Sequence, residues 1–70
     1  MLIVGKRRLT KATFGVILEA STAVSVPAGQ VVEILTTPIH GERTIDVIWD
    51  GKKVMMFVSD LGDRSQPFNP

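Results

Sequence analysis

The feature of the sequence that most constrains the fold is the dipeptide Asp50-Gly51, which joins two runs of alternating residues. A two-residue primed turn needs positive φ angles that Asp and Gly tolerate, so this dipeptide is a strong β-hairpin signal. Residues 44–49 and residues 52–58 each place apolar side chains on one face. These sets are Ile45, Val47 and Trp49 in the first run, and Val54, Met56 and Val58 in the second. The sequence therefore predicts an antiparallel hairpin with one buried face.

Two earlier segments also have strand character. Residues 30–36 place Val32 and Ile34 on one side, and Pro38 ends the run because proline cannot donate to a sheet ladder. Residues 11–21 have two interpretations. A strand face would contain Ala12, Phe14, Val16 and Leu18, and a helical stripe would contain Phe14, Leu18 and Ser21. A strand is favoured, because this segment is rich in β-branched residues and glycine, which form helices poorly.

Short strands separated by turn signals, in a chain of 70 residues, predict a single all-β domain. In residues 59–62 a serine and an aspartate precede leucine and glycine, a pattern that predicts a short 3-10 turn. Residues 65–70 contain two prolines and no periodicity, which predicts a loose C-terminal tail. The folded domain is therefore expected to span residues 1–64.

Several kinds of site are excluded or disfavoured by composition. The chain has no cysteine, so disulfides, thiolate metal sites and cysteine nucleophiles are excluded. Its single histidine, His40, cannot build a histidine-rich metal site, and no glycine-rich phosphate loop is present, so no metal or cofactor is expected. No apolar run approaches the roughly 18 residues of a membrane span, and no secretory signal is evident. We therefore expect a cytoplasmic protein without membrane contact.

Three segments follow one another in a distinctive order: Pro-Ala-Gly-Gln-Val-Val-Glu-Ile-Leu at 27–35, Thr-Ile-Asp-Val-Ile-Trp-Asp-Gly-Lys-Lys-Val-Met-Met-Phe at 44–57, and Ser-Asp-Leu at 59–61. This order resembles the small bacterial SH3-like barrel proteins, and the resemblance covers residues 25–62. It implies a five-stranded SH3-like barrel with a long first loop at 19–26 and a helical turn at 59–61 before the last strand. Residues 62–70 are poor strand sequence, so residues 2–4 are an alternative source of a closing strand. SH3-like barrels host many roles, including peptide binding, RNA binding and cell-wall binding, so the resemblance specifies no function.

The aspartates and the histidine have structural explanations that do not involve catalysis. Asp46 falls on a solvent face, Asp50 belongs to a turn, and Asp60 is placed to cap a helical turn. His40 precedes a glycine in a loop, and no serine or threonine sits in a nucleophile motif. We therefore expect no catalytic residues and no enzyme activity. An alternative, an active site shared between copies at a symmetry axis, has no recognisable active-site residues in this chain.

An apolar outer face is the main anomaly of the predicted barrel. If Val54 and Met56 point inward, alternation places their neighbours outward. The outward apolar set on adjacent strands is Leu35, Ile48, Met55 and Phe57. Monomers rarely expose such patches without using them, so these residues are a candidate protein interface. The alternatives are a bulge that turns Phe57 inward, or cover from the N-terminal segment or from Phe68. The favoured function is a non-catalytic interaction module or accessory protein with a protein partner, including a homodimer.

A second hypothesis is based on basic residues. Half of the eight lysines and arginines fall within residues 6–11, and two more follow the Asp50-Gly51 turn. The candidate nucleic-acid contacts are Lys6, Arg7, Arg8, Lys11, Lys52 and Lys53. Such a set would give an RNA-associated barrel with salt-dependent binding. Against it, the net charge is only +1, tyrosine is absent, and charge on an N-terminal strand also protects a sheet edge.

Overall fold

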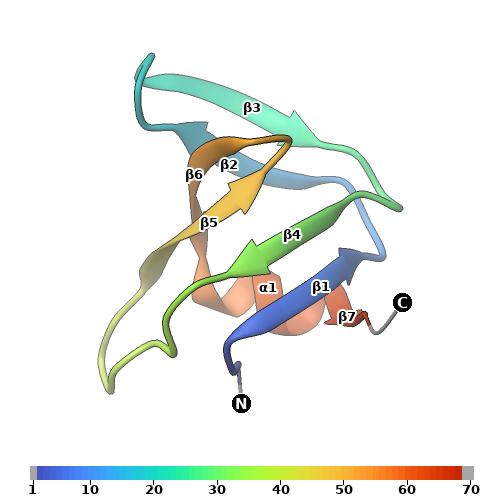
Figure 1. Ribbon diagram of the computed structural model, residues 1–70, viewed down its shortest axis with the longest axis vertical. Coiled ribbons are helices and arrows are strands. Elements are labelled where there is room, and N and C mark those ends of the chain that lie inside the picture. The colour runs from blue at the N-terminus through green and yellow to red at the C-terminus, as the bar shows by residue number, and fades with distance from the viewer. Residues whose placement is uncertain (1, 69–70) are drawn as a thin grey trace.

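Seven strands and one short helix make up the computed structural model, which describes residues 2–68 (Figure 1). In chain order these elements are β1 (Gly5–Leu9), β2 (Thr13–Ile17), β3 (Thr22–Val26), β4 (Val31–Ile34), β5 (Thr44–Trp49), β6 (Lys52–Phe57), α1 (Val58–Asp63) and β7 (Ser65–Pro67). The strands form one antiparallel sheet in the order β3-β2-β6-β5-β4-β1-β7, so β3 and β7 are its edges. Strands account for 51% of the structure and helix for 9%, which confirms the all-β class.

The β5–β6 hairpin forms as the turn chemistry predicts. Asp50 and Gly51 have φ angles of 52° and 73°, the positive values that a type I′ turn requires. Trp49 pairs with Lys52 across this turn, and the register continues to Thr44 and Phe57 at the far end.

Residues 11–21 contain a strand, so the favoured interpretation is confirmed and the helical alternative is wrong. β2 pairs with β3 on one side, through a hairpin turn in which Ser21 has a φ of 51°. On its other side β2 pairs with β6, far along the chain, with Val16 opposite Met55. β2 is therefore held between two strands, and its exposed residues lie on the outer surface of the sheet.

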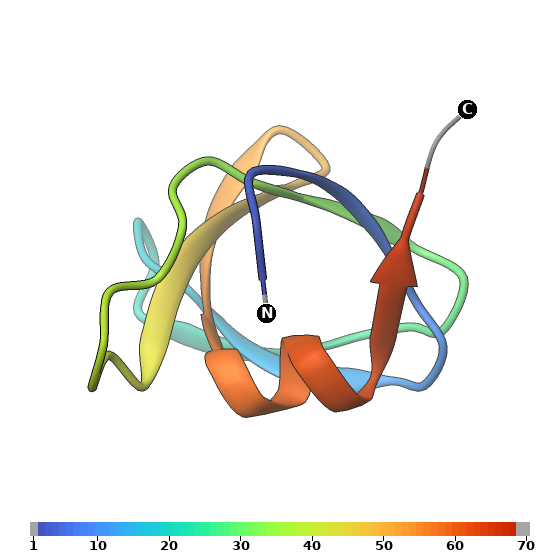
Figure 2. The ribbon, with the colours of Figure 1, turned by 90° about the horizontal axis from the view of Figure 1, so that it is seen from below.

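The curled sheet encloses the core on its inner face. In Figure 2 the strands curve around a common centre and α1 lies along the lower side of the molecule. The buried apolar residues come from five strands, from α1 and from the N-terminal segment. They are Leu2, Leu9, Val26, Val32, Ile34, Ile45, Val47, Val54, Met56 and Leu61. The inward sets predicted for β4 and β6 are thus confirmed at Val32, Ile34, Val54 and Met56.

Three details differ from the sequence-based expectations. The sheet has seven strands where five were expected, and one of the additional strands is β3, which forms within residues 19–26, the expected first loop. The helical turn expected at 59–62 is a six-residue α-helix, α1. The Arg64 amide donates to the Asp60 carbonyl at 2.7 Å, an i to i−4 bond that a 3-10 turn lacks. Leu61, which is buried, anchors this helix to the core.

The third difference concerns residues 65–70, which were expected to be a loose tail. Ser65–Pro67 form β7 and pair with β1, and the Phe68 amide donates to the Lys6 carbonyl at 3.0 Å. This pairing is stabilised by Arg7, whose guanidinium donates to Ser65 Oγ at 2.7 Å and to the Ser65 carbonyl at 2.9 Å. Residues 2–4, the alternative closing strand, form no strand. Residues 69–70 lie outside the described part of the chain.

Candidate protein-interaction surface

Met55 and Phe57 point away from the core, as alternation along β6 predicts. Their neighbours Val54 and Met56 are completely buried, so the side chains between and after them face outward. Met55 is half-buried, and the Phe57 side chain is 44% exposed. The expected outward orientation of these two residues is therefore confirmed.

The sheet register joins Met55 and Phe57 to the outer face of β2. Val16 pairs with Met55, and the pairing of Gly15 with Met56 brings the adjacent residues Phe14 and Phe57 near one another. The Phe14 and Phe57 rings stack with centroids 6.5 Å apart and an angle of 27° between their planes. We call these four side chains, Phe14, Val16, Met55 and Phe57, the outer patch.

Phe14 and Val16 face outward because of the residues that alternate with them. Thr13 is buried, and its hydroxyl donates to the Lys11 carbonyl at 2.8 Å. Gly15 has no side chain where β2 approaches β6, and a Cβ there would lie 2.6 Å from Val54 Cγ1. Thr13 and Gly15 therefore occupy the inner side of β2, and Phe14, which alternates with them, faces the outer surface.

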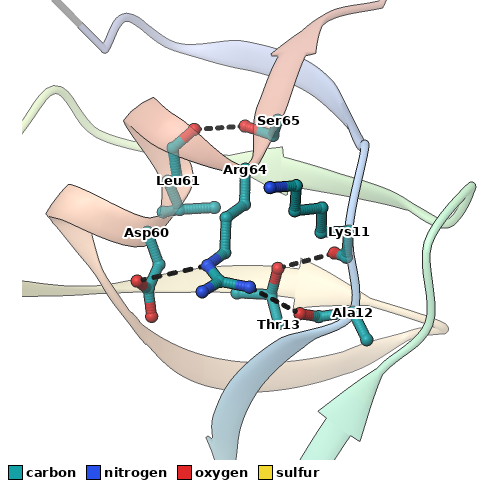
Figure 3. A network of polar contacts seen from close by, with 7 residues as sticks. All are labelled: Lys11, Ala12, Thr13, Asp60, Leu61, Arg64 and Ser65. Carbon is teal, nitrogen blue, oxygen red and sulfur yellow. Dashed lines mark hydrogen bonds and ion pairs between the residues drawn. The ribbon is translucent and has the colours of Figure 1, made fainter.

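A polar network holds the segment that leads into β2 (Figure 3). Arg64, which follows α1, donates to the Ala12 carbonyl at 3.4 Å, and its Nε lies 3.9 Å from Asp60 Oδ1. The Ser65 hydroxyl donates to the Leu61 carbonyl within the same region. The Arg64 contact ties the end of α1 to Ala12, two residues before Phe14.

Leu35 and Ile48 do not join the outer patch. Ile48 pairs with Lys53 on one side and with Glu33 on the other, so charged residues flank it on both neighbouring strands. Asp46 pairs with Met55 and places a carboxylate between Met55 and β4. Leu35 is exposed just beyond the end of β4. The four residues predicted as an interface therefore do not form one apolar cluster; Met55 and Phe57 lie beside Phe14 and Val16, and an interface role for any of them stays a prediction.

A groove continues from Phe57 towards the start of α1. It has a volume of about 450 Å³ and is lined by Glu42, Arg43, Phe57, Val58 and Ser59. Glu42 and Arg43 are exposed and carry opposite charges. The outer patch thus passes through Phe57 into a concave region with a polar rim, an arrangement typical of protein-binding surfaces.

The basic residues proposed for nucleic-acid contact are spread over the sheet. Lys6 lies opposite Glu33 in the β1–β4 strand register, and the Arg7 guanidinium donates a hydrogen bond to Ser65. The Arg8 guanidinium lies 4.6 Å from the centre of the Phe68 ring. Lys11 is exposed in the loop between β1 and β2, whereas Lys52 and Lys53 belong to β6. Two strands, β5 and β4, separate β6 from β1. The two basic groups therefore do not form one surface, and nucleic-acid contact stays a prediction.

The titratable residues considered for catalysis are distributed as structural roles require. Asp46 faces outward on β5, and Asp50 occupies the β5–β6 turn. The capping role predicted for Asp60 is wrong: Phe57 is the N-cap of α1, no side chain caps the helix, and Asp60 lies within its first turn, where it pairs with Arg64. His40 is exposed in the loop between β4 and β5. Within residues 2–68 no three histidine, aspartate or glutamate side chains converge into a group suited to a metal ion.

Comparisons of the chain with protein-family models, with curated proteins and with solved structures found no match. The one helix in residues 2–68, α1, is too short to cross a membrane.

Proposed function

We propose that this chain is a non-catalytic protein-interaction module and that the outer patch is its binding surface. The observation that carries the proposal is the stacked pair Phe14 and Phe57, whose side chains are 49% and 44% exposed on the outer face of the sheet. Aromatic residues and methionine are enriched at the centres of protein interfaces, and aromatic anchors contribute much of the binding energy. Val16 and Met55 extend this pair into a surface made of four apolar side chains.

The proposed partner is a protein that places apolar side chains over the ring pair and polar groups over the adjoining groove. Glu42 and Arg43 line that groove beside Phe57, and their opposite charges suit a partner segment with charges in a matching order. In this arrangement the patch supplies affinity, and the charged rim determines orientation.

The proposal includes an SH3-like architecture and a cytoplasmic setting. When the β2–β3 hairpin is counted as an elaborated first loop, five strands remain and α1 precedes the last of them, in the order that the family resemblance implies. Pro27-Ala28-Gly29 then leads into β4, the second of the five. A chain without cysteine has no requirement for an oxidising compartment, which supports the cytoplasm.

The test uses a double variant, Phe14→Thr with Phe57→Thr, and a matched control, Ile39→Thr, which changes an apolar residue that is 74% exposed on a loop. Threonine suits a strand surface, so the double variant keeps its fold. Proteins retained from an extract of the source cells by the wild-type chain are identified and purified, and their affinity for each variant is measured by calorimetry. We expect the double variant to bind at least ten-fold more weakly and the control to bind like the wild type.

Three results would overturn the proposal. The first is a purified partner that binds the double variant as tightly as the wild type, and the second is that no protein is retained above background. The third is retained material that consists of nucleic acid and is released by nuclease, which would favour the basic residues of β1 and β6 instead.

A further inference from the structure

β3 is an edge strand that lacks the usual protection against pairing. Natural sheet edges carry charged side chains, prolines or bulges that prevent another strand from adding. The five residues of β3 are Thr-Ala-Val-Ser-Val, with no charge and two β-branched valines, and Pro27 follows only after the strand has ended. Figure 1 shows β3 as the outermost strand, beyond β2 and with no other strand on its far side. This edge is therefore available for strand addition.

The direction of the backbone groups in β3 follows from the ladder between β2 and β6. The Leu18 amide donates to the Lys53 carbonyl at 3.2 Å, so the even-numbered residues along this part of the chain direct their N–H and C=O groups towards β6. Backbone groups alternate in direction along a strand, so Gly15 and its odd-numbered neighbours are directed towards β3. Gly15 pairs with Val24, which is therefore directed back towards β2.

The same alternation assigns the open side of β3. If Val24 is bonded to β2, then Ala23 and Ser25 on either side direct their N–H and C=O groups away from the sheet. Both residues are exposed and have small side chains. The free hydrogen-bonding groups of this edge are thus placed symmetrically about Val24.

We propose that β3 pairs with β3 of a second copy of this chain, antiparallel and around a two-fold axis at Val24. In this register Ala23 of each copy lies opposite Ser25 of the other, and each such pair exchanges N–H···O bonds as a hydrogen-bonded pair of an antiparallel ladder does. A two-fold axis requires a self-complementary edge, which the symmetric placement of these residues provides. Because β3 has no charged residue, self-pairing brings no like charges together.

The pairing also joins the outer faces of the two copies. Ser25 lies beside Phe14 and Ala23 lies beside Val16 in the β2–β3 register. A β3–β3 contact therefore places the outer patches of both copies on one continuous sheet surface. The inference goes beyond the proposed function, since the contact uses backbone groups of β3 and does not require the patch to bind anything.

The main test is a proline substitution at one of the open-edge amides. Ser25→Pro removes an N–H that is directed away from β2, so the β2–β3 ladder keeps its bonds while the contact between copies loses its own. Ser25→Thr keeps the N–H and is the matched control. A second variant, Ala23→Lys, places a charge at the edge, and Thr36→Lys adds the same charge on an exposed residue outside the strands. Circular dichroism establishes that each variant is folded.

Sedimentation velocity of the full chain from about 1 µM to about 1 mM covers the range in which weak homodimers dissociate. We expect the wild type, Ser25→Thr and Thr36→Lys to dimerise alike, and the other two variants to dissociate at least ten-fold more readily. Amide exchange at Ala23 and Ser25 should slow as the wild-type concentration rises. A wild type that is monomeric throughout, or a dimer that survives Ser25→Pro, would overturn the inference.

Three other outcomes separate this inference from the proposed function. A dimer that is lost in the Phe14→Thr, Phe57→Thr variant but kept in Ser25→Pro assigns self-association to the outer patch and overturns the β3 contact. A monomeric chain that binds a foreign extended peptide along β3 overturns the second copy as the occupant. Loss of the dimer in Ser25→Pro with unchanged binding of another protein supports the β3 contact independently of the patch.

Discussion

Gly15 of β2 packs directly against β6, and replacing it with alanine tests how tightly the two strands pack. An added Cβ would lie 2.6 Å from Val54 Cγ1 and 3.3 Å from both the Met55 carbonyl oxygen and Met56 Cγ. Carbon atoms in contact are separated by about 3.5–4.0 Å, and Val54 is completely buried, so its methyl group has no free space to move into. Overpacking of this kind costs about 1–3 kcal/mol.

The measurement is the free energy of unfolding in urea, compared with a glycine substitution that meets no obstacle. Gly62 lies on the exposed side of α1, has no atom within 4 Å of a Cβ position and has no positive φ. Gly62→Ala should stabilise the chain by about 0.5–1 kcal/mol. Both substitutions restrict the unfolded chain equally. The difference between their changes in the free energy of unfolding therefore reports packing in the folded state. The total free energy of unfolding of a domain of this size is about 4–10 kcal/mol, so the expected loss is easy to measure.

A second background identifies the clash itself. Val54→Ala removes the methyl group that the new Cβ would meet, and alone it costs about 2 kcal/mol through lost burial and a cavity. In that background Gly15→Ala should cost less than about 1 kcal/mol, because neighbouring substitutions that relieve one contact are not additive. If Gly15→Ala leaves stability unchanged, or if it costs the same in both backgrounds, β2 does not pack on β6 as described here.

Three further substitutions test the contacts that shape the molecule, each by urea unfolding. Arg7→Met removes both side-chain hydrogen bonds to Ser65 and should lower the free energy of unfolding by about 1–3 kcal/mol. Faster amide exchange in β7 would show that this strand is the part that is destabilised. Asp60→Asn should cost less than about 1 kcal/mol, because its ion pair with Arg64 spans 3.9 Å and both side chains are partly exposed; a larger loss would contradict this view. Gly51→Ala places a side chain at a φ of 73° and should cost about 1 kcal/mol, and a neutral result would exclude the type I′ turn.

Local signals made the central part of the fold predictable. Asp50-Gly51 specifies a turn by its own conformational preference, and alternation on each side then determines which residues enter the core. The pairing of β2 with β6 has no such signal, because the strands are distant in the chain and Val16 shows no preference for Met55 over other strand residues. Similarly, Ser65–Pro67 is weak strand sequence, and it forms β7 because Arg7 and the β1 backbone supply its partners.

The candidate site was predictable to the same extent. Met55 and Phe57 were identified because alternation along one strand decides their orientation. Phe14 was recognised as part of an apolar strand face, but that face was not assigned to the outside, since an aromatic residue ordinarily belongs to the core. The deciding feature was Gly15, which can be recognised as an inward residue only when the approach of β6 is known. The charged neighbours of Ile48, Glu33 and Lys53, depend on strand register, so alternation along β5 alone does not reveal them.

The pairing of β1 with β7 sets an order of events while the chain is being synthesised. β1 emerges from the ribosome early, yet one of its two neighbours is β7, and both hydrogen bonds from the Arg7 side chain end on Ser65, 58 residues later. The local hairpins β2–β3 and β5–β6 can form as soon as their residues emerge. One edge of β1 stays unpaired until Ser65–Pro67 have emerged, so a nascent chain halted before Ser65 would expose that edge to other proteins in the cell.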